Sequence, residues 1–259
     1  MTPIKVAVHG ALGKVGKEVV KAVSLDSDTY LVGTVDIKAE GNKLTVPDSK
    51  ITVPLSTSIE EIIHSTRPDV IVDFTIAKAA VPAIHTALKD KVHMVIGTTG
   101  FSKDDLAEFD RLAKENGVGI VIAANFAIGA VLMMHMAKIA AKYFDYAEIV
   151  ELHHHLKADA PSGTSIATAR GMAQSRGKSF LVTPGPARGK QIEGITIHSV
   201  RLPGLMAHQE VLLGTSGQTL TIRHDTISRE CYMPGVMLAV KEVINRKGLI
   251  FGLDNLLGL

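Results

Sequence analysis

The sequence predicts an α/β protein: an N-terminal Rossmann-like, doubly wound parallel sheet, followed by a C-terminal α+β domain with a mixed, largely antiparallel sheet. Three observations predict this class. Short β-branched runs alternate with helix-like segments through the first half of the chain, as in βαβ units. A glycine-rich turn directly follows the first of these runs. After about residue 125 the strand-like runs alternate apolar and polar residues, which is typical of a half-exposed sheet.

The individual elements follow from these patterns. In the first half, the predicted strands are Ile4–Val8, Leu31–Val35, Val70–Phe74, Val92–Ile96 and Val118–Ala123. The predicted helices between them are Val15–Val23, Ile59–Ser65, Ala79–Lys89 and Lys103–Asn116, the last with Ser102 as its N-cap. In the second half, the predicted strands are Ala147–Leu152, Thr196–Leu202, Glu210–Gly214 and Thr219–His224.

Two segments of the second half set the domain boundaries. A Pro/Gly-rich loop, Thr183–Gly194, separates a helical segment after Ser162 from the later strands. A final helix near Gly235–Asn245 could pack back onto the first domain. We therefore expect one domain from residues 1–126, completed by about residues 230–259, and a second domain from residues 127–229.

Composition and charge narrow the possible partners. The 259 residues are 46% hydrophobic, which is enough for a substantial core. Because 28 Lys and Arg nearly balance 26 Asp and Glu without a long block of one sign, nucleic acid is not an expected partner. The single cysteine, Cys231, cannot form an internal disulfide, and no signal-peptide pattern follows Met1. These features predict a cytoplasmic protein.

The run Gly117–Met134 is almost entirely apolar and reaches the length of a membrane span. Asn125 and three glycines interrupt it, and no aromatic belt or basic flank follows. The preferred interpretation is a buried parallel strand, Val118–Ala123, then a turn, then an amphipathic helix from about Ala127. No membrane partner is expected.

A candidate cofactor motif, Gly10-Ala11-Leu12-Gly13-Lys14-Val15-Gly16, opens a helix directly after the first strand. Glycines there permit a tight turn and close backbone approach to a pyrophosphate, whose charge then lies at the helix N-terminus. The G-x-x-G-x-x-G spacing departs from G-x-G-x-x-G, and a plain strand-to-helix turn is the alternative.

Asp36 ends the next strand, 20 positions after Gly16. A carboxylate there can accept hydrogen bonds from the adenosine ribose hydroxyls of a dinucleotide, and it would repel the 2′-phosphate of NADPH. Lys38 lies two residues on and could partly compensate, so the expected cofactor is NADH, NADPH or both. An ordinary solvated turn residue is the alternative for Asp36.

Two further strand ends carry small or polar residues: Gly97-Thr98-Thr99-Gly100 and Ala123-Ala124-Asn125-Phe126. Ligands of open α/β sheets bind beyond the carboxyl ends of the strands. We therefore expect these loops to contact the nicotinamide half of the cofactor, although each could also be a simple turn.

The densest polar segment runs from Glu151 to Thr164 as ELHHHLKADAPSGT. On an extended chain His153, His155 and Lys157 share one face. His-x-His can bind zinc, but local spacing offers no third ligand and a lysine is a poor neighbour for a dication, so no metal is predicted.

The favoured interpretation of this segment is a proton and anion site, because histidine titrates near neutral pH and lysine supplies charge and a proton. Ser162-Gly163-Thr164 then opens a helix whose free N–H groups can hold a carboxylate. A surface strand with chance histidines and a capped helix is the structural alternative.

This segment, His153-His154-x-x-Lys157-x-Asp159-Ala160-Pro161-Ser162-Gly163-Thr164, resembles the signature of the 4-hydroxy-tetrahydrodipicolinate reductases, also called dihydrodipicolinate reductases. The glycine loop, Gly97–Gly100 and Ala124–Phe126 fall in the same order as in that family, so the resemblance covers essentially the whole chain. It implies hydride transfer from NAD(P)H to the ring of dehydrated hydroxy-tetrahydrodipicolinate, giving tetrahydrodipicolinate and water in diaminopimelate and lysine biosynthesis.

The resemblance also implies residue roles. His153 matches the proton donor and acceptor, Lys157 a second proton donor, and His154 with the Gly163-Thr164 backbone the contacts of the substrate carboxylates. The matching cofactor contacts are Gly10–Val15, Asp36, Gly97–Thr99 and Ala123–Phe126. Residues 1–126 are then the dinucleotide-binding domain, and residues 127–229 bind a small dicarboxylate and join a homotetramer through their sheet.

Two positions depart from the family pattern. Leu156 stands where some members carry another basic residue, so we expect a lower charge around the substrate. Ile37 stands beside the acidic residue where some members have an arginine suited to NADPH, which leaves the NADPH preference open.

Three other classes are alternatives. Another two-domain Rossmann enzyme, such as an aspartate or sugar dehydrogenase, would share the cofactor half but give no reason for His153–Thr164. A non-catalytic redox sensor would bind the dinucleotide without needing the clustered His and Lys. A zinc hydrolase would be separable by metal analysis.

Overall fold

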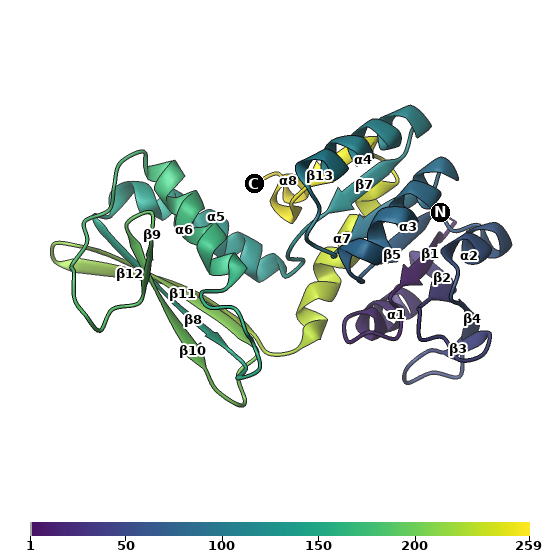
Figure 1. Cartoon of the computed structure of the whole chain (residues 1–259), viewed down its shortest axis with the longest axis horizontal. Coiled ribbons are helices and arrows are strands. Elements are labelled where there is room, and N and C mark those ends of the chain that lie inside the picture. The colour runs from purple at the N-terminus through teal and green to yellow at the C-terminus, as the bar shows by residue number, and fades with distance from the viewer. Residues whose placement is uncertain (1) are drawn as a thin grey trace. The chain divides into compact units, whose positions relative to one another are not determined.

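The computed structural model describes residues 2–259, which form two compact units (Figure 1). One unit contains the chain up to Ala127 together with Tyr232–Leu259, and the other contains Ile128–Cys231. The first unit is therefore completed by a segment that returns from the far end of the chain.

The first unit is built on one sheet. Among the described residues its strand order is β13-β7-β6-β5-β1-β2-β4-β3. Neighbouring strands pair in parallel except β3 and β4, which pair antiparallel. The strands are β1 (Ile4–His9), β2 (Thr29–Val35), β3 (Lys43–Thr45), β4 (Thr52–Ser56), β5 (Val70–Asp73), β6 (His93–Ile96), β7 (Gly119–Ile122) and β13 (Gly248–Phe251). Because the chain winds outward from β1 in both directions, the predicted doubly wound sheet is confirmed.

Helices cover this sheet. They are α1 (Gly16–Leu25), α2 (Ile59–Thr66), α3 (Ala77–Lys89), α4 (Lys103–Asn116), α7 (Met233–Val243) and α8 (Leu253–Leu257). The bounds of α4 are those predicted, and Ser102 caps it in a reciprocal capping box with Asp105. α1 and α7 pack against each other and against the sheet.

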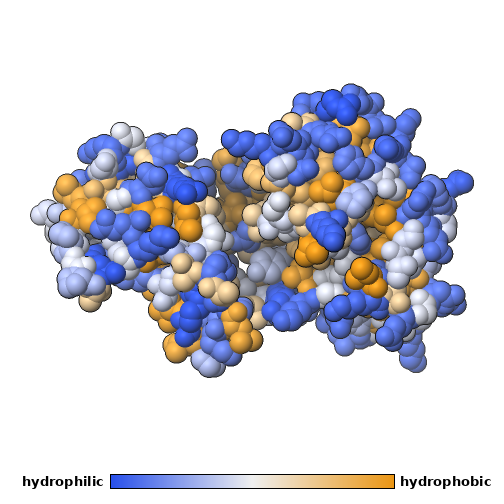
Figure 2. Space-filling view, viewed as in Figure 1, coloured by the Kyte–Doolittle hydropathy of each residue, from blue (hydrophilic) through white to orange (hydrophobic). Residues whose placement is uncertain are grey.

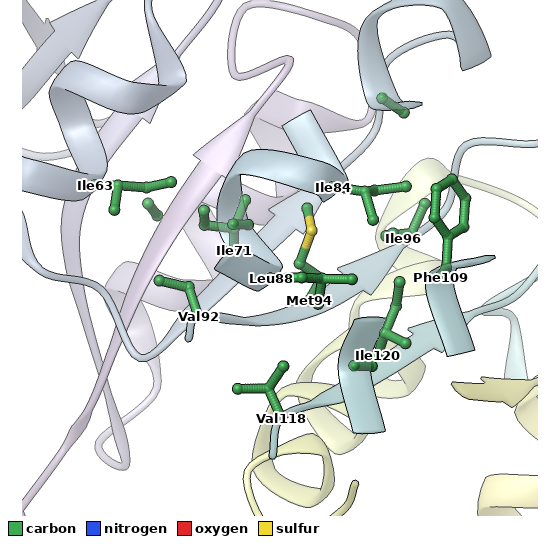
Figure 3. Close-up of a cluster of buried hydrophobic side chains, with 14 of the residues drawn as sticks. Ile63, Ile71, Ile84, Leu88, Val92, Met94, Ile96, Phe109, Val118 and Ile120 are labelled. Carbon is green, nitrogen blue, oxygen red and sulfur yellow. The ribbon is translucent and has the colours of Figure 1, made fainter. Parts of the chain in front are cut away.

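One part of the first unit's core lies between the sheet and α2, α3 and α4. Ile84 and Leu88 of α3 and Phe109 of α4 meet Met94 and Ile120 of the central strands (Figure 3). All five side chains are fully buried, and each contributes roughly 1.5–3 kcal/mol by leaving water. The rigid sheet that results fixes the strand ends from which the candidate cofactor loops leave.

The second unit has a mixed sheet with the order β12-β11-β8-β10-β9. β8 pairs in parallel with β10, whereas the other pairs are antiparallel, so the predicted mixed, largely antiparallel sheet is confirmed. Its strands are β8 (Tyr146–His153), β9 (Lys190–Ile192), β10 (Ile195–Arg201), β11 (Ala207–Thr215) and β12 (Gln218–Thr226). Its helices are α5 (Ile128–Ala140) and α6 (Gly163–Arg176), with short 3₁₀ turns η1 (Ala141–Tyr143) and η2 (Arg229–Tyr232).

One face of this second sheet is covered. Met133 and Ala137 of α5 and Met172 of α6 form a buried cluster with Ile149 and Val211 of the sheet. Alternate strand residues must therefore point away from both helices. The covered face holds the second unit's core.

Four short strands were not predicted: β3, β4, β9 and β13. Runs of three to five residues are too short to show a period of two, and β13 finds its partner β7 far back in the chain. The prediction of an unbroken loop over Thr183–Gly194 is wrong at β9, which pairs with β10. Glu193 and Gly194 both adopt positive φ between these strands, as tight hairpin turns require.

The apolar run Gly117–Met134 contains β7, a turn and the start of α5, as predicted. No helix among residues 2–259 combines the length and apolar character that a membrane crossing requires. On the face shown in Figure 2, hydrophilic residues dominate the surface and hydrophobic ones are scattered among them.

Candidate active site

The glycine loop lies where β1 gives way to α1. Gly10 has a φ of +82°, and a Cβ there would lie 2.6 Å from the carbonyl oxygen of Phe74. A Cβ on Gly16 would lie 2.0 Å from the carbonyl oxygen of Gly10, so α1 begins in direct backbone contact with the loop. The first N–H groups of a helix have no intrahelical acceptor. The N–H groups from Gly10 to Gly13 already donate to Val35, Asp36 and Gly10. The donors that fit a dinucleotide pyrophosphate are therefore those that follow Gly13, where α1 begins at the carboxyl edge of the sheet.

Asp36 fastens this loop to β2. The side chain is 7% exposed; its Oδ2 accepts a hydrogen bond of 2.9 Å from the Leu12 N–H, and its Oδ1 one of 2.9 Å from the Lys38 N–H. Each carboxylate oxygen has a second lone pair, so ribose hydroxyls could bind in addition. Ile37 is 89% exposed and does not take part in this contact.

A buried carboxylate that the sequence interpretation did not single out lies at the end of β5. Asp73 is completely buried and accepts a hydrogen bond of 2.6 Å from the Thr98 hydroxyl, which in turn accepts one of 2.8 Å from the Thr75 N–H. His9 Nδ1 lies 2.6 Å from Asp73 Oδ2, without the alignment of a hydrogen bond. This cluster holds the ends of β1, β5 and β6 together, and it fixes Thr98 of the predicted nicotinamide loop.

The other predicted cofactor residues divide by exposure. The side chains of Ala11, Ala123 and Phe126 are at most 1% exposed, so only their backbone can reach a ligand. The Phe126 ring packs on Phe74 with centroids 5.8 Å apart. The remaining members of this set are at least partly accessible: Gly13, Lys14, Val15, Gly97, Thr99, Ala124 and Asn125.

In the second unit, β8 ends at His153 and a loop leads to the start of α6. Ser162 is the N-cap: its hydroxyl accepts a hydrogen bond of 3.2 Å from the Ser165 N–H. The Ser165 hydroxyl donates to Gln209 of β11, whose amide donates to Thr168, so this first turn is anchored to the sheet. Gly163 is exposed, and the space where a Cβ would stand is open. The free N–H groups of this turn therefore face an accessible position.

Positive charge gathers beside that turn. The pKa of His154 lies below its usual value because of desolvation and the nearby charges of His153, Lys157, His155 and Arg229. Lys157 Nζ lies 2.7 Å from Asp159 Oδ1, and this hydrogen bond lowers the pKa of Asp159. The cationic groups and the helix start together suit a ligand with more than one carboxylate. Arg229, from η2, was not among the predicted site residues.

The structure adds a further group that was not predicted, Glu151, in contact with His153. Its carboxylate contacts His153 Nδ1 and the guanidinium of Arg201, and it is completely buried. Strand alternation places Glu151 and His153 on one face of β8, so the sequence held a signal for this contact. Arg201 comes from β10 and carried no such signal. Among residues 2–259 no three His, Cys, Asp or Glu side chains gather as a metal site would require.

Comparison with known proteins accounts for both halves of the chain. The model for the dihydrodipicolinate reductase N-terminus matches residues 4–126, and the model for its C-terminus matches residues 129–257. The chain belongs to the dihydrodipicolinate reductase family. The resemblance found in the sequence is thereby confirmed.

Individual relatives agree with this family. A 4-hydroxy-tetrahydrodipicolinate reductase of Dehalococcoides mccartyi (strain CBDB1) is 52% identical over 263 residues, covering 100% of each chain. That of Syntrophomonas wolfei subsp. wolfei is 46% identical, covering 98% of each.

Among solved structures, a dipicolinate-bound dihydrodipicolinate reductase from Paenisporosarcina sp. TG-14 matches with a TM-score of 0.87 and 41% identity, covering 98% of this chain and 99% of that one. A scyllo-inositol dehydrogenase from Lactobacillus casei with bound NAD(H) matches with a TM-score of 0.64 at 11% identity, covering 99% of this chain and 93% of that one. At that identity the likeness to the sugar dehydrogenase shows a shared fold alone.

Proposed function

We propose that this chain reduces 4-hydroxy-tetrahydrodipicolinate with NADH or NADPH, giving tetrahydrodipicolinate and water, as a step of diaminopimelate and lysine biosynthesis. The observation that carries the proposal is full-length family membership, with a reductase of that name 52% identical over the whole chain. The proposal includes a cytoplasmic setting, because reducing conditions suit an enzyme with one free thiol, Cys231.

The first unit would hold the cofactor. The pyrophosphate would lie on the Gly10–Val15 backbone, the ribose hydroxyls on Asp36, and the nicotinamide between the Gly97–Thr99 and Ala123–Phe126 loops. The bound dihydronicotinamide supplies a hydride. The close approach of Gly16 to Gly10 supports this role, because it places the start of α1 directly at the loop.

The second unit would hold the substrate. One carboxylate would accept from the Gly163 and Thr164 N–H groups in front of the Ser162 cap, and the other would contact His154 and Lys157. The bound dipicolinate named for the Paenisporosarcina relative is a cyclic dicarboxylate of the same kind. Leu156 is 77% exposed and adds no charge to this region.

Proton transfer would fall to His153 and Lys157. Hydride addition to one ring carbon leaves negative charge that moves along the conjugated system toward the ring nitrogen. A neighbouring acid must supply a proton there, and both side chains belong to the cationic group beside the α6 start. Asp159 accepts hydrogen bonds from Lys157 Nζ and so holds the lysine side chain in place.

Cofactor choice would depend on Asp36 and Lys38. Asp36 is nearly buried and committed to two backbone donors, so it would stay in place and repel a 2′-phosphate. Lys38 is exposed and close enough in sequence to offset part of that repulsion. We therefore propose a preference for NADH with residual use of NADPH.

A homotetramer would form through the open face of the second sheet. Val150, Leu152, Val200 and Leu212 alternate with the residues that pack on α5 and α6, so they lie on the uncovered face. They are half-buried in the single chain, and an apolar sheet face of this kind is normally covered.

The proposed function is tested by following NADH and NADPH absorbance with purified protein, while a coupled synthase makes the substrate from pyruvate and aspartate semialdehyde. We expect oxidation that depends on the synthase, with higher kcat/KM for NADH. Binding of NADH without any synthase-dependent oxidation would overturn the proposal and favour a sensor or a different dehydrogenase.

A further inference from the structure

Glu151 lies in an unusually complete set of hydrogen bonds for a buried acid. The two terminal nitrogens of Arg201 donate to its two oxygens at 2.8 Å each. The Ser162 N–H donates to Oε1 at 3.3 Å, and His153 Nδ1 contacts Oε2. Burying such a charge is costly, and an apolar pair of similar volume would often be as stable. Stability alone therefore does not account for a buried carboxylate at this position.

The charge state of Glu151 determines which proton its histidine carries. Burial raises the pKa of this carboxyl group, but hydrogen bonds from His153, Arg201 and Ser199 outweigh it and lower the pKa to about 2. Glu151 is thus ionised at neutral pH and can only accept a hydrogen bond. The hydrogen between the two side chains must belong to His153 Nδ1, which leaves Nε2 as the nitrogen that can gain or release a proton.

Arg201 extends this arrangement to the loop after β8. Besides Glu151, its guanidinium donates to the backbone oxygen of Asp159 at 2.7 Å. One ion pair therefore ties together the end of β8, the loop that carries Lys157, and the cap of α6 at Ser162. The strand register supports the Glu151–Arg201 ion pair, because the parallel pairing of β10 with β8 sets Arg201 opposite His153.

We propose that Glu151, held by Arg201, is the positioning residue that fixes the tautomer and orientation of His153, so that Nε2 exchanges the proton with the substrate. This inference rests on the proposed function, which makes His153 the proton donor. Other charged or titratable groups close by are His154, His155, Lys157 and Asp159 of the loop and Arg229 of η2. They supply positive charge or balance it, and Glu151 is the one that contacts the ring.

The first test replaces Glu151 with an uncharged residue of the same shape. In Glu151→Gln the amide can donate to Nδ1 and favour the wrong tautomer, and the imidazolium loses its negative partner. We expect kcat to fall about 100-fold, as for loss of a general acid, with KM and the NADH Kd changed by less than about 3-fold. The pH above which kcat declines should move to a lower value. Glu151→Asp should restore part of kcat and the pH of that decline.

A matched control lies on the same strand. Glu148 also contacts an arginine and a histidine, Arg188 and His198, but on the opposite face of β8. Glu148→Gln should leave kcat and its pH profile unchanged. A paired variant, Glu151→Leu with Arg201→Met, removes both charges and should fold, yet it should lose the same 100-fold in kcat. Wild-type kcat and pH profile in either Glu151 variant would overturn the proposal.

A second measurement is independent of turnover. In wild-type protein the His153 Nδ1 proton should give a strongly downfield NMR resonance, as expected for a proton shared with a carboxylate, and Glu151→Gln should abolish it while Glu148→Gln should not. Absence of that resonance in the wild type would overturn the positioning role. If the resonance is present and the wild type fails to turn over, the proposed function fails instead, so the two failures are distinguishable.

Discussion

Lys157, which pairs with Asp159, is proposed both to contact a substrate carboxylate and to donate a proton, and replacing it tests that role most directly. Lys157→Ala should lower kcat about 100-fold, the effect of losing a proton donor, and leave the NADH Kd within about 2-fold. Steady-state kinetics and a fluorescence titration of NADH measure the two effects. Lys142→Ala, in η1, is the control, and unchanged kcat in Lys157→Ala would remove this residue from the mechanism.

If His154 contacts a substrate carboxylate as proposed, substrate binding should depend on pH. Its pKa is lowered by desolvation and by its positive neighbours, so it is mostly neutral at neutral pH. A bound carboxylate would favour the imidazolium and raise that pKa, so dipicolinate binding should take up a proton and strengthen as pH falls from about 8 to about 6. Calorimetry in buffers of different ionisation enthalpy measures the uptake. It should vanish in His154→Gln; the same uptake in that variant would assign the proton to another group.

For single residues, the sequence predicted the candidate site residues that are neighbours in the chain. It missed those that only the fold brings to the site. His153, Lys157 and Ser162 lie in one segment whose residue types indicate proton and anion chemistry. Arg201 and Asp73 act through partners that are distant in sequence, and only strand order and register bring them to the site. Glu151 was within the same segment as His153, and strand alternation could have identified it.

Among the helices and strands, the junction of β1 and α1 leaves very little room for a larger side chain. Because a Cβ on Gly16 would meet the Gly10 carbonyl oxygen at 2.0 Å, Gly16→Ala must shift α1 or the loop. We expect a lower midpoint of thermal unfolding and at least 10-fold weaker NADH binding. Gly171→Ala is the control, because its Cβ would meet only the flexible end of Lys138 within another helix. Wild-type stability and NADH binding in Gly16→Ala would show that this close approach is not required.

The helices and short strands show what hydrophobic periodicity can and cannot predict. The long amphipathic helix α4 was predicted to the residue because a capping serine and an αL glycine, Gly117, mark its two ends, whereas the predicted bounds of α1, α2 and α3 differ by one or two residues. The short strands β3, β4, β9 and β13 were missed because three to five residues carry no period, and they form only where a neighbouring strand offers hydrogen bonds. β13 is the extreme case, since it joins β7 from the opposite end of the sequence.

For the whole molecule, the face of the second sheet that α5 and α6 do not cover leads us to predict a homotetramer. Leu212→Lys places a charge among Val150, Leu152 and Val200, so it should dissociate a homotetramer into smaller species. Light scattering after size exclusion measures the mass. Leu25→Lys, at a 75% exposed position on α1, should leave the mass unchanged. A wild-type mass of one chain, or an unaltered tetramer in Leu212→Lys, would contradict the proposed interface.

In the proposed reaction, hydride passes from a nicotinamide to the ring of the substrate. The most direct measurement uses NADH with deuterium at both positions of the reactive ring carbon, with substrate from the coupled synthase, and determines the product mass. We expect tetrahydrodipicolinate that carries a single deuterium, formed in step with NADH oxidation. Product without deuterium, or NADH that is bound and left unoxidised, would contradict the proposed hydride transfer.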